Sequence, residues 1–234
     1  MRSALRSLAV SMFLVTSAAP PAASKDNLQD LIARLDRAAS AFKAMTAQVT
    51  YLNHTDVLGE DDTEKGAVTM QKVQDGEVRG RVDFTAPDAK TVTFEKRRFS
   101  IYYPKINTLQ VYDLDKHGEQ LDRFVMIGFG TSGTELARDY DMTIVASEVP
   151  KGQSVEAIRL QLVPKSGDAR EYVKKLELWI PQQGDPYPVQ EKISQPSGDY
   201  RLVTYSELKI NPALKADVLQ LKLPAGVKVE HPQK

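Results

Sequence analysis

Cysteine is absent from the 234-residue sequence. Without it the chain can form no disulfide bond, no thiolate metal site and no cysteine nucleophile, and it offers no cysteine for lipid attachment. Histidine is scarce. His54, His117 and His231 are far apart in the sequence, and no pair has the spacing of a metal-binding motif. We therefore expect neither a metal ion nor another cofactor.

The sequence also has no excess of charge of either sign, with 31 Lys and Arg residues against 31 Asp and Glu residues. Nucleic-acid-binding proteins need a basic face, so a nucleic acid is not expected as a partner. Long hydrophobic runs are missing as well, because no segment approaches the roughly 20 apolar residues that a membrane-spanning helix requires. We expect a soluble, monomeric protein.

Residues 1–23 have the features of a secretory signal peptide. Two arginines near the start are followed by an apolar stretch from Leu8 to Val15 and then by small residues and prolines. Cleavage after Ala23 is the preferred prediction and cleavage after Ala18 is the alternative. A disordered N-terminus is the competing interpretation. Export of a chain without cysteine favours a bacterial periplasm over eukaryotic secretion.

Residues 24–234 are predicted to form a single domain. The content of 41% hydrophobic and 26% charged residues is typical of globular proteins, so the chain can bury a core. Apolar residues from Leu28 to Phe42 recur at helical spacing and predict one amphipathic helix. No internal repeat and no low-complexity linker divides the remainder of the chain.

After this helix the hydrophobic period changes to two, as in strands. Links such as Asp75-Gly76 are too short for crossover helices, so neighbouring strands must pair antiparallel. The acidic run at 60–64 is interpreted as a solvated loop between strands. About ten or eleven strands are expected, and they are predicted within residues 68–70, 78–84, 92–94, 99–103, 109–111, 143–149, 155–163, 173–180, 188–195, 200–210 and 218–223.

These elements predict an α+β protein built on one long antiparallel sheet. A sheet of this length curls or closes. The opening helix and the segment 121–140 can cover only one face, so we expect a concave apolar face with a helical roof and a wet opposite face.

The motifs give no support for catalysis, and the chain is predicted not to be an enzyme. Residues 128–133, Gly-Phe-Gly-Thr-Ser-Gly, match the dinucleotide-binding fingerprint, but that motif needs a parallel βαβ unit. They are interpreted as a sharp link between two helices. No Gly-x-Ser-x-Gly nucleophile motif occurs. An apolar concave sheet suits a lipid or acyl chain, and an ordinary dry core explains the same pattern equally well.

Several segments, in order, resemble the LolA family of periplasmic outer-membrane lipoprotein carriers. The resemblance extends from about Asp26 to Val229. The segments that support it are Ala47-Gln48-Val49-Thr50, Lys65-Gly66-Ala67-Val68-Thr69-Met70, Arg81-Val82-Asp83-Phe84-Thr85-Ala86-Pro87, Phe99-Ser100-Ile101-Tyr102-Tyr103-Pro104, Asn107-Thr108-Leu109-Gln110-Val111-Tyr112, Leu160-Gln161-Leu162-Val163-Pro164-Lys165 and Leu221-Lys222-Leu223-Pro224-Ala225-Gly226-Val227.

The resemblance implies an incomplete, half-open β-barrel with a helical lid, whose cavity binds the acyl chains of lipoproteins or lipids. It also implies two partners, an inner-membrane ABC transporter that releases lipoproteins and an outer-membrane acceptor. The family's receptor relative is lipidated at a cysteine, so this chain fits the soluble carrier better. The alternative function is an envelope-stress sensor or regulatory lipid-binding domain on the same fold.

The candidate site residues follow from the alternation together with this resemblance. The cavity candidates are Val68, Met70, Val82, Phe84, Val92, Phe94, Phe99, Ile101, Tyr103, Leu109, Val111, Leu160, Leu162, Leu176 and Leu178. The lid candidates are Leu31, Leu35, Phe42, Phe124, Ile127 and Phe129. Arg79 and Arg81 are candidates for the basic residue that holds the lid in the family, although the proline and the aromatic residue that accompany it there are missing.

Overall fold

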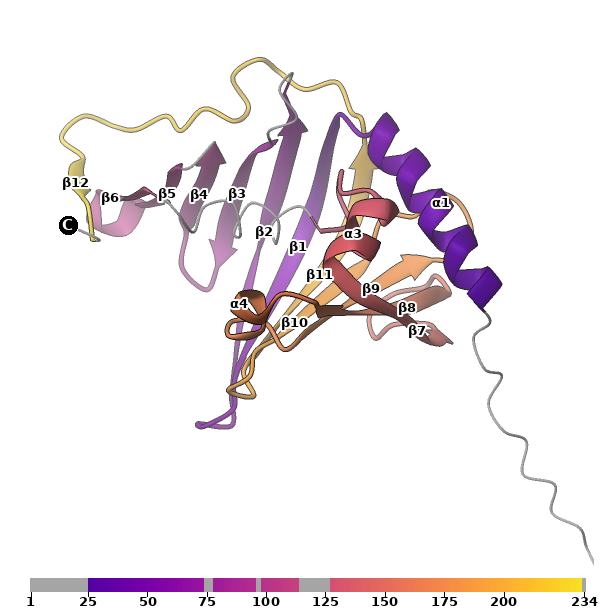
Figure 1. Cartoon of the computed structure of the whole chain (residues 1–234). Coiled ribbons are helices and arrows are strands. Elements are labelled where there is room, and N and C mark those ends of the chain that lie inside the picture. The colour runs from indigo at the N-terminus through magenta and orange to yellow at the C-terminus, as the bar shows by residue number, and fades with distance from the viewer. Residues whose placement is uncertain (1–24, 74–77, 96–97, 114–126, 233–234) are drawn as a thin grey trace, which may run out of the picture.

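The computed structural model describes residues 25–73, 78–95, 98–113 and 127–232 (Figure 1). The helical elements in these residues are α1 (Lys25–Ala41), the 3-10 helix η1 (Pro104–Ile106), α3 (Gly133–Asp139) and α4 (Gly167–Arg170). The strands are β1 (Ala44–Thr55), β2 (Glu60–Lys72), β3 (Val78–Ala86), β4 (Lys90–Glu95), β5 (Arg98–Tyr103), β6 (Thr108–Asp113), β7 (Tyr140–Glu148), β8 (Ala157–Pro164), β9 (Lys175–Pro181), β10 (Gln190–Ser194), β11 (Tyr200–Ile210) and β12 (Lys228–Glu230).

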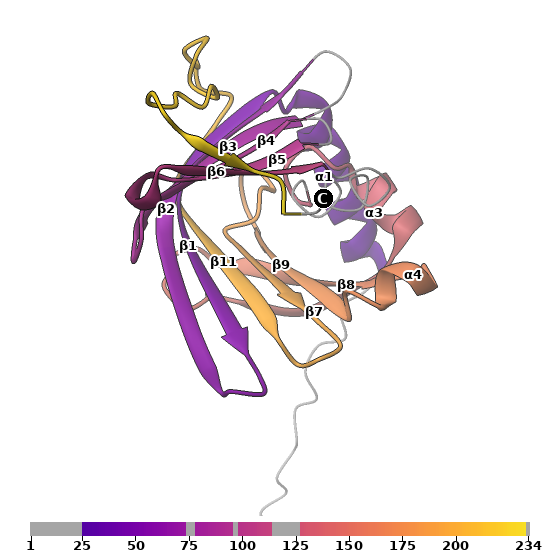
Figure 2. The ribbon, with the colours of Figure 1, turned by 90° about the vertical axis from the view of Figure 1, so that its left-hand side faces the viewer.

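All twelve strands belong to one sheet, in the order β12-β6-β5-β4-β3-β2-β1-β11-β10-β9-β8-β7. Two antiparallel meanders, β1–β6 and β7–β11, are joined where β1 pairs with β11. Only β12 is parallel to its neighbour, β6. Figure 2 shows the sheet curving through three sides of the molecule without closing, with α1 and α3 on the fourth side. The predicted class, a long, curved and half-open antiparallel sheet with few helices, is confirmed.

Three strand predictions are wrong in detail. β1 was not predicted, because its start (Ala-Met-Thr-Ala) has weak β-propensity and its pairing with β11 comes from residues about 150 positions later. The acidic run at 60–64 begins β2 instead of forming a loop, since its exposed side chains leave the backbone free to pair with β1. Residues 218–223 form no strand. They lie between Pro212 and Pro224, and turn hydrogen bonds curl them.

The opening helix is confirmed as α1, which lies across the concave side of the sheet (Figure 1). The short helix α3 packs on α1 at very close range. A β-carbon on Gly133 would lie only 2.6 Å from the carbonyl oxygen of Ile32, so glycine is required at this crossing. Thr134 donates to the carboxylate of Asp36 through its backbone N–H and its hydroxyl, both at 2.8 Å. None of the helices that the structure describes is long and apolar enough to span a membrane.

Candidate functional site

One face of the sheet is concave and apolar across almost all its strands. Directly opposed residues of an antiparallel pair have their side chains on the same side, so the pairs Met45–Met70, Val82–Val92 and Leu160–Leu178 fix which residues share this face. Two hydrophobic clusters lie on it, one on each half of the sheet.

The β1–β4 cluster contains many of the cavity candidates. Phe99 and Ile101 of β5 are partly buried and pack against it, and Tyr103 lies farther along the same face by register. The buried residues of this cluster are Phe42, Met45, Ala47, Val49, Val68, Met70, Val78, Val82, Phe84, Val92, Phe94, Phe129, Tyr187, Val203 and Tyr205.

The β7–β9 cluster contains four further cavity candidates, Leu160, Leu162, Leu176 and Leu178. α1 and α3 cover it directly, through Leu31, Leu35 and Leu136. Its buried residues are Leu31, Leu35, Ile127, Leu136, Tyr140, Leu160, Leu162, Val173, Leu176, Leu178 and Ile180.

The turn at 127–130 contacts both clusters and forms a roof over the line between them. Ile127 belongs to the β7–β9 cluster and Phe129 to the β1–β4 cluster. The Phe129 ring stacks on Tyr187 at 6.0 Å and meets Tyr205 edge-on at 5.1 Å. Between them Gly128 has φ +89°, and a β-carbon there would lie 2.5 Å from the Pro188 ring. This turn therefore requires glycine at 128, because other residues rarely adopt this positive φ and because a side chain would collide with the Pro188 ring.

The lid candidates divide between the clusters accordingly. Leu31, Leu35 and Ile127 pack in the β7–β9 cluster, whereas Phe42 and Phe129 pack in the β1–β4 cluster. Phe124 lies outside the described residues, as do Asp75-Gly76 and most of the segment 121–127.

Polar contacts fasten the α1 side of the roof to the sheet and its loops, among them a 2.9 Å hydrogen bond from Asn211 Nδ2 to the carbonyl oxygen of Ala41. Arg34 Nη2 donates to the carbonyl oxygen of Pro181 at 2.8 Å and to that of Gly184 at 3.3 Å. The Tyr187 hydroxyl donates to the carbonyl oxygen of Ala38 at 3.0 Å. A hollow of about 540 Å³ lies beside these contacts, between the end of α1 and the loop before β10.

One acidic residue lies on the concave face between the two clusters. Glu191 of β10 is opposite Val203 of the β1–β4 cluster on one side and Leu178 of the β7–β9 cluster on the other. It is 7% exposed, and its Oε1 has no hydrogen-bond partner among the described residues. Burial raises the pKa of Glu191 to about 8, although a hydrogen bond from Tyr205 acts in the opposite direction.

Two phenols surround this carboxyl group. Burial, followed by the charge of Glu191, raises the pKa of Tyr205 well above its ordinary value. Burial and then the charge of Glu191 also raise the pKa of Tyr51 to about 12, although the positive charge of Arg201 acts to lower it. Farther along the face, Lys90 Nζ lies 2.6 Å from Glu64 Oε1 and 4.8 Å from the centre of the Phe84 ring. A polar row therefore crosses the otherwise apolar face.

Four candidate residues lie on the opposite, convex face, so their predicted roles are wrong. In the β5–β6 pair, the concave-face residues Phe99 and Ile101 lie opposite Tyr112 and Gln110. Val111 and Leu109 lie opposite Ser100 and Tyr102, the residues of β5 that point to the other face. Because β6 pairs in this register, Leu109 and Val111 point away from the clusters. The other two residues are Arg79 and Arg81, which alternate with the inward Val78, Gly80 and Val82.

Both arginines are engaged on the convex face, and their partners among the described residues lie outside the roof. Arg79 Nη2 lies 3.0 Å from Glu95 Oε1. Arg81 pairs with Asp83 and donates to the carbonyl oxygen of Gln220 at 2.7 Å, so it fastens the C-terminal segment that runs from β11 to β12 in Figure 1.

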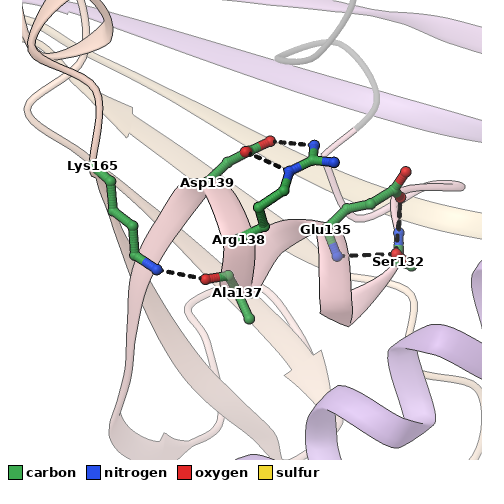
Figure 3. Close-up of polar contacts among 6 residues, drawn as sticks. All are labelled: Ser132, Glu135, Ala137, Arg138, Asp139 and Lys165. Carbon is green, nitrogen blue, oxygen red and sulfur yellow. Dashed lines mark hydrogen bonds and ion pairs between the residues drawn. The ribbon is translucent and has the colours of Figure 1, made fainter.

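A second hollow, of about 220 Å³, lies beside α3. Its charged side chains are occupied by the local contacts that Figure 3 shows. Arg138 makes two 2.8 Å hydrogen bonds to Asp139, and Lys165 Nζ donates to the carbonyl oxygen of Ala137 at 2.7 Å. Ser132 and Glu135 form a reciprocal capping box, whose hydrogen bonds lower the pKa of Glu135. These contacts stabilise the start and end of α3.

Sequence reasoning missed Glu191, Tyr205 and Tyr51. A signal was present, because Glu191 lies between Val189 and Ile193 in a period-two stripe and therefore belongs to the apolar face of its strand. Among residues 25–73, 78–95, 98–113 and 127–232, no cluster of His, Asp and Glu could hold a metal ion.

No protein-family model and no curated protein matches the sequence. Solved structures do match. A crystal structure of MucB matches 86% of this chain and 64% of that chain, with 18% identity and a TM-score of 0.51. An uncharacterized conserved protein from Thermus thermophilus matches 87% of this chain and 98% of that chain, with 14% identity and a TM-score of 0.50. A LolA superfamily protein from Nitrosomonas europaea matches 83% of this chain and 97% of that chain, with 12% identity and a TM-score of 0.40.

These identities are all below 25%, so the likenesses concern the fold. The chain spans 64% of the MucB chain, which is less than two thirds of its length. The large sheet, its open curvature and the helices on its concave side define the class of fold, an open barrel. This is the half-open sheet with a helical cover that the sequence resemblance implied, and the chain shares its fold with MucB and with the Thermus thermophilus protein.

Proposed function

We propose that this protein is a periplasmic carrier that binds the acyl chains of lipoproteins, or of lipids, on its concave face and transports them from the inner to the outer membrane. The observation that supports this most directly is the wide, mainly apolar concave face of an unclosed sheet, covered by a roof that contacts both clusters. No catalytic step is part of the proposal, and the protein acts by binding and release.

The β1–β4 cluster is the proposed acyl-chain site. It presents Met70, Phe84 and Phe94 beside partly buried Phe99 and Ile101, which together form a wide apolar surface. The flexible Met side chain adapts its shape to different apolar ligands. The aromatic rings supply large apolar areas. Burial of each methylene group contributes about 0.8 kcal/mol, so a 16-carbon chain needs only part of its length buried for tight binding.

Loading requires the roof to exchange its own contacts for lipid. Phe42, Phe129 and Tyr187 form an aromatic group over the β1–β4 cluster, with ring centres 6.0–6.4 Å apart. An acyl chain that displaces these rings replaces their apolar contacts with its own. The free energy of opening is then offset by the lipid, and the roof remains closed in its absence.

Residues 1–23 act in this proposal as a cleaved signal peptide, and residues 24–234 as a single, monomeric binding domain in the periplasm. An inner-membrane ABC transporter that releases lipoproteins supplies the cargo, and an outer-membrane acceptor receives it. The apolar face is the only part of the chain that the proposal assigns to cargo.

The test is native mass spectrometry of the protein purified from the periplasm, compared with Phe94→Asp and with Val111→Asp. Phe94 is 9% exposed on the concave face, whereas Val111 lies on the convex face. An unpaired buried carboxylate costs several kcal/mol or stays protonated. We expect Phe94→Asp to abolish lipid recovery and Val111→Asp to preserve it.

The identity of the cargo separates the possible outcomes. Triacylated peptide supports the lipoprotein carrier, and free phospholipid or glycolipid identifies a lipid shuttle. Recovery of a stoichiometric protein partner without any lipid favours the regulatory domain and contradicts the carrier. Equal lipid recovery from wild type and Phe94→Asp removes the β1–β4 cluster from the site. A mature N-terminus between Ala19 and Lys25 in the same spectra is expected, and an intact Met1 would contradict export with cleavage.

A further inference from the structure

The polar group at Glu191 has no role in the binding of an aliphatic chain, yet it lies at the centre of the apolar face. Its strand neighbours on this face are Val203 and Leu178, one from each cluster. A carboxyl group that is 7% exposed and has one oxygen unpaired among the described residues is costly to bury. An apolar residue at this position would make a continuous core.

The surroundings of Glu191 form a built polar site. Tyr205 and Tyr51 lie on the same face as Glu191 and are close enough for its charge to raise the pKa of both phenols. The roof passes directly above, since a β-carbon on Gly128 would lie 3.2 Å from Glu191 Oε1. The unpaired oxygen therefore faces the roof, which is the side from which cargo reaches the sheet.

We propose that Glu191, together with Tyr205 and Tyr51, binds the ester or amide carbonyl group of an acyl chain that lies on the concave face. This inference rests on the proposed carrier function and names the chemical group that the carrier recognises. An acyl chain is uniform along its length, so apolar contacts alone do not fix its position. The carbonyl is the one strong hydrogen-bond acceptor at the start of the chain.

The protonation state of Glu191 suits this ligand. With its pKa raised to about 8, the carboxyl group keeps its proton at neutral pH and can donate a hydrogen bond. A carbonyl oxygen accepts such a bond, and the ligand then satisfies an oxygen atom that the closed protein leaves unpaired.

The polar row gives the bound chain a direction. From Glu191 the row continues through Tyr51 to Glu64 and Lys90, whose side chains are 18% and 24% exposed. The head group of the lipid leaves the apolar face along this row. The tail then lies over the β1–β4 cluster, where Val68, Val82 and Val92 are only 4–8% exposed.

The experiment compares two lipids that differ only by the carbonyl group. The probes are 1-palmitoyl-lysophosphatidylcholine, which has an ester, and 1-O-hexadecyl-lysophosphatidylcholine, which has an ether, each titrated calorimetrically below its micelle concentration. We expect the wild-type chain to bind the ester about fivefold more tightly, the usual size of one net hydrogen bond. Glu191→Met is expected to bind both lipids equally, and Glu191→Gln, which can still donate, to keep the preference.

Glu177→Gln is the matched control, because Glu177 is 6% exposed on the neighbouring strand but points to the convex face and pairs with Lys175 at 3.0 Å. It should keep the ester preference. Equal binding of ester and ether by the wild type overturns the carbonyl subsite while leaving the carrier function intact. A preference that survives in Glu191→Met also overturns it. Binding of neither lipid overturns the subsite and the proposed function together.

Discussion

Leu160, Leu162 and Ile180 of the β7–β9 cluster are 0% exposed, whereas Phe84, Val92 and Phe94 of the β1–β4 cluster are 8–9% exposed. The first group is sealed by Leu31, Leu35 and Leu136 from two helices that are tied to each other through Asp36 and Thr134. The second belongs to the cluster that Phe42, at the C-terminal side of α1, and Phe129 of the turn enter, two rings whose centres are 6.4 Å apart. One concave face thus combines a fully buried core with a slightly more exposed apolar surface, which is the part that we propose binds cargo.

The difference in exposure between the two clusters indicates that an apolar stripe on a curved sheet can have different roles in its two halves. The cavity candidates Leu160, Leu162, Leu176 and Leu178 are placed in the sealed half, and we assign them to stability. Val68, Val82, Val92 and Phe94 are placed in the other half, and we assign them to cargo. The following substitutions test this division.

Leu160→Ala is expected to have the largest effect on stability, a loss of about 2–5 kcal/mol, because the fully buried site is held by two helices and collapses poorly around the cavity. Urea denaturation measures it. Val92→Ala, in the β1–β4 cluster, removes less apolar volume and should cost about 1–2 kcal/mol. Val92→Ala should also weaken lipid binding, whereas Leu160→Ala should leave lipid binding unchanged. Equal effects of the two variants on both properties would refute the division.

Gly133→Ala should separate α3 from α1, because the new β-carbon would meet the backbone of Ile32 at 2.6 Å. Overpacking of this kind costs about 1–3 kcal/mol. Thermal unfolding measures the loss. Gly167→Ala in α4 is the control, since nothing lies within 4 Å of its added carbon, and it should be neutral. A fully stable Gly133→Ala would mean that the two helices are not rigidly paired over the β7–β9 cluster.

Glu191, which lies between the two clusters, is expected to make the stability of the fold depend on pH. Its pKa is raised from 4.5 to about 8 on folding, so the folded chain binds more protons than the unfolded chain between these values. Stability is therefore highest below about pH 4.5 and falls as pH rises towards 8, by up to about 1.4 kcal/mol per pH unit from this group. Glu191→Gln should remove this slope, and Glu177→Gln should not. Urea unfolding at pH 5, 6.5 and 8 measures it.

Arg81→Ala should have the smallest effect, less than about 1 kcal/mol, since its ion pair with Asp83 is partly exposed. Its contact with Gln220 predicts faster amide exchange in residues 217–223, without any change in lipid affinity. Altered lipid affinity in this variant would instead restore a role for Arg81 in closing the roof.

The sequence by itself determined the local elements and their alternation. The 3.6-residue period of Leu28 to Phe42 specifies α1, and the short hairpin links from β2 to β6 leave no pairing except an antiparallel meander. Period two also assigned Val68, Val82, Val92 and Phe94 to one face, because each neighbouring strand is paired in register with the last.

Only the tertiary structure decided what depends on contacts between distant segments. β1 and β11 meet across about 150 residues, and this pairing places Tyr51 opposite Val203 and Tyr205 opposite Val49. Because Glu191 lies opposite Val203 on the other side of β11, the three polar residues then share one face. The register of β6 turned Leu109 and Val111 to the convex face, where a shift of one residue would have turned them inward. Such choices depend on long-range pairing and loop closure, which local periodicity does not encode.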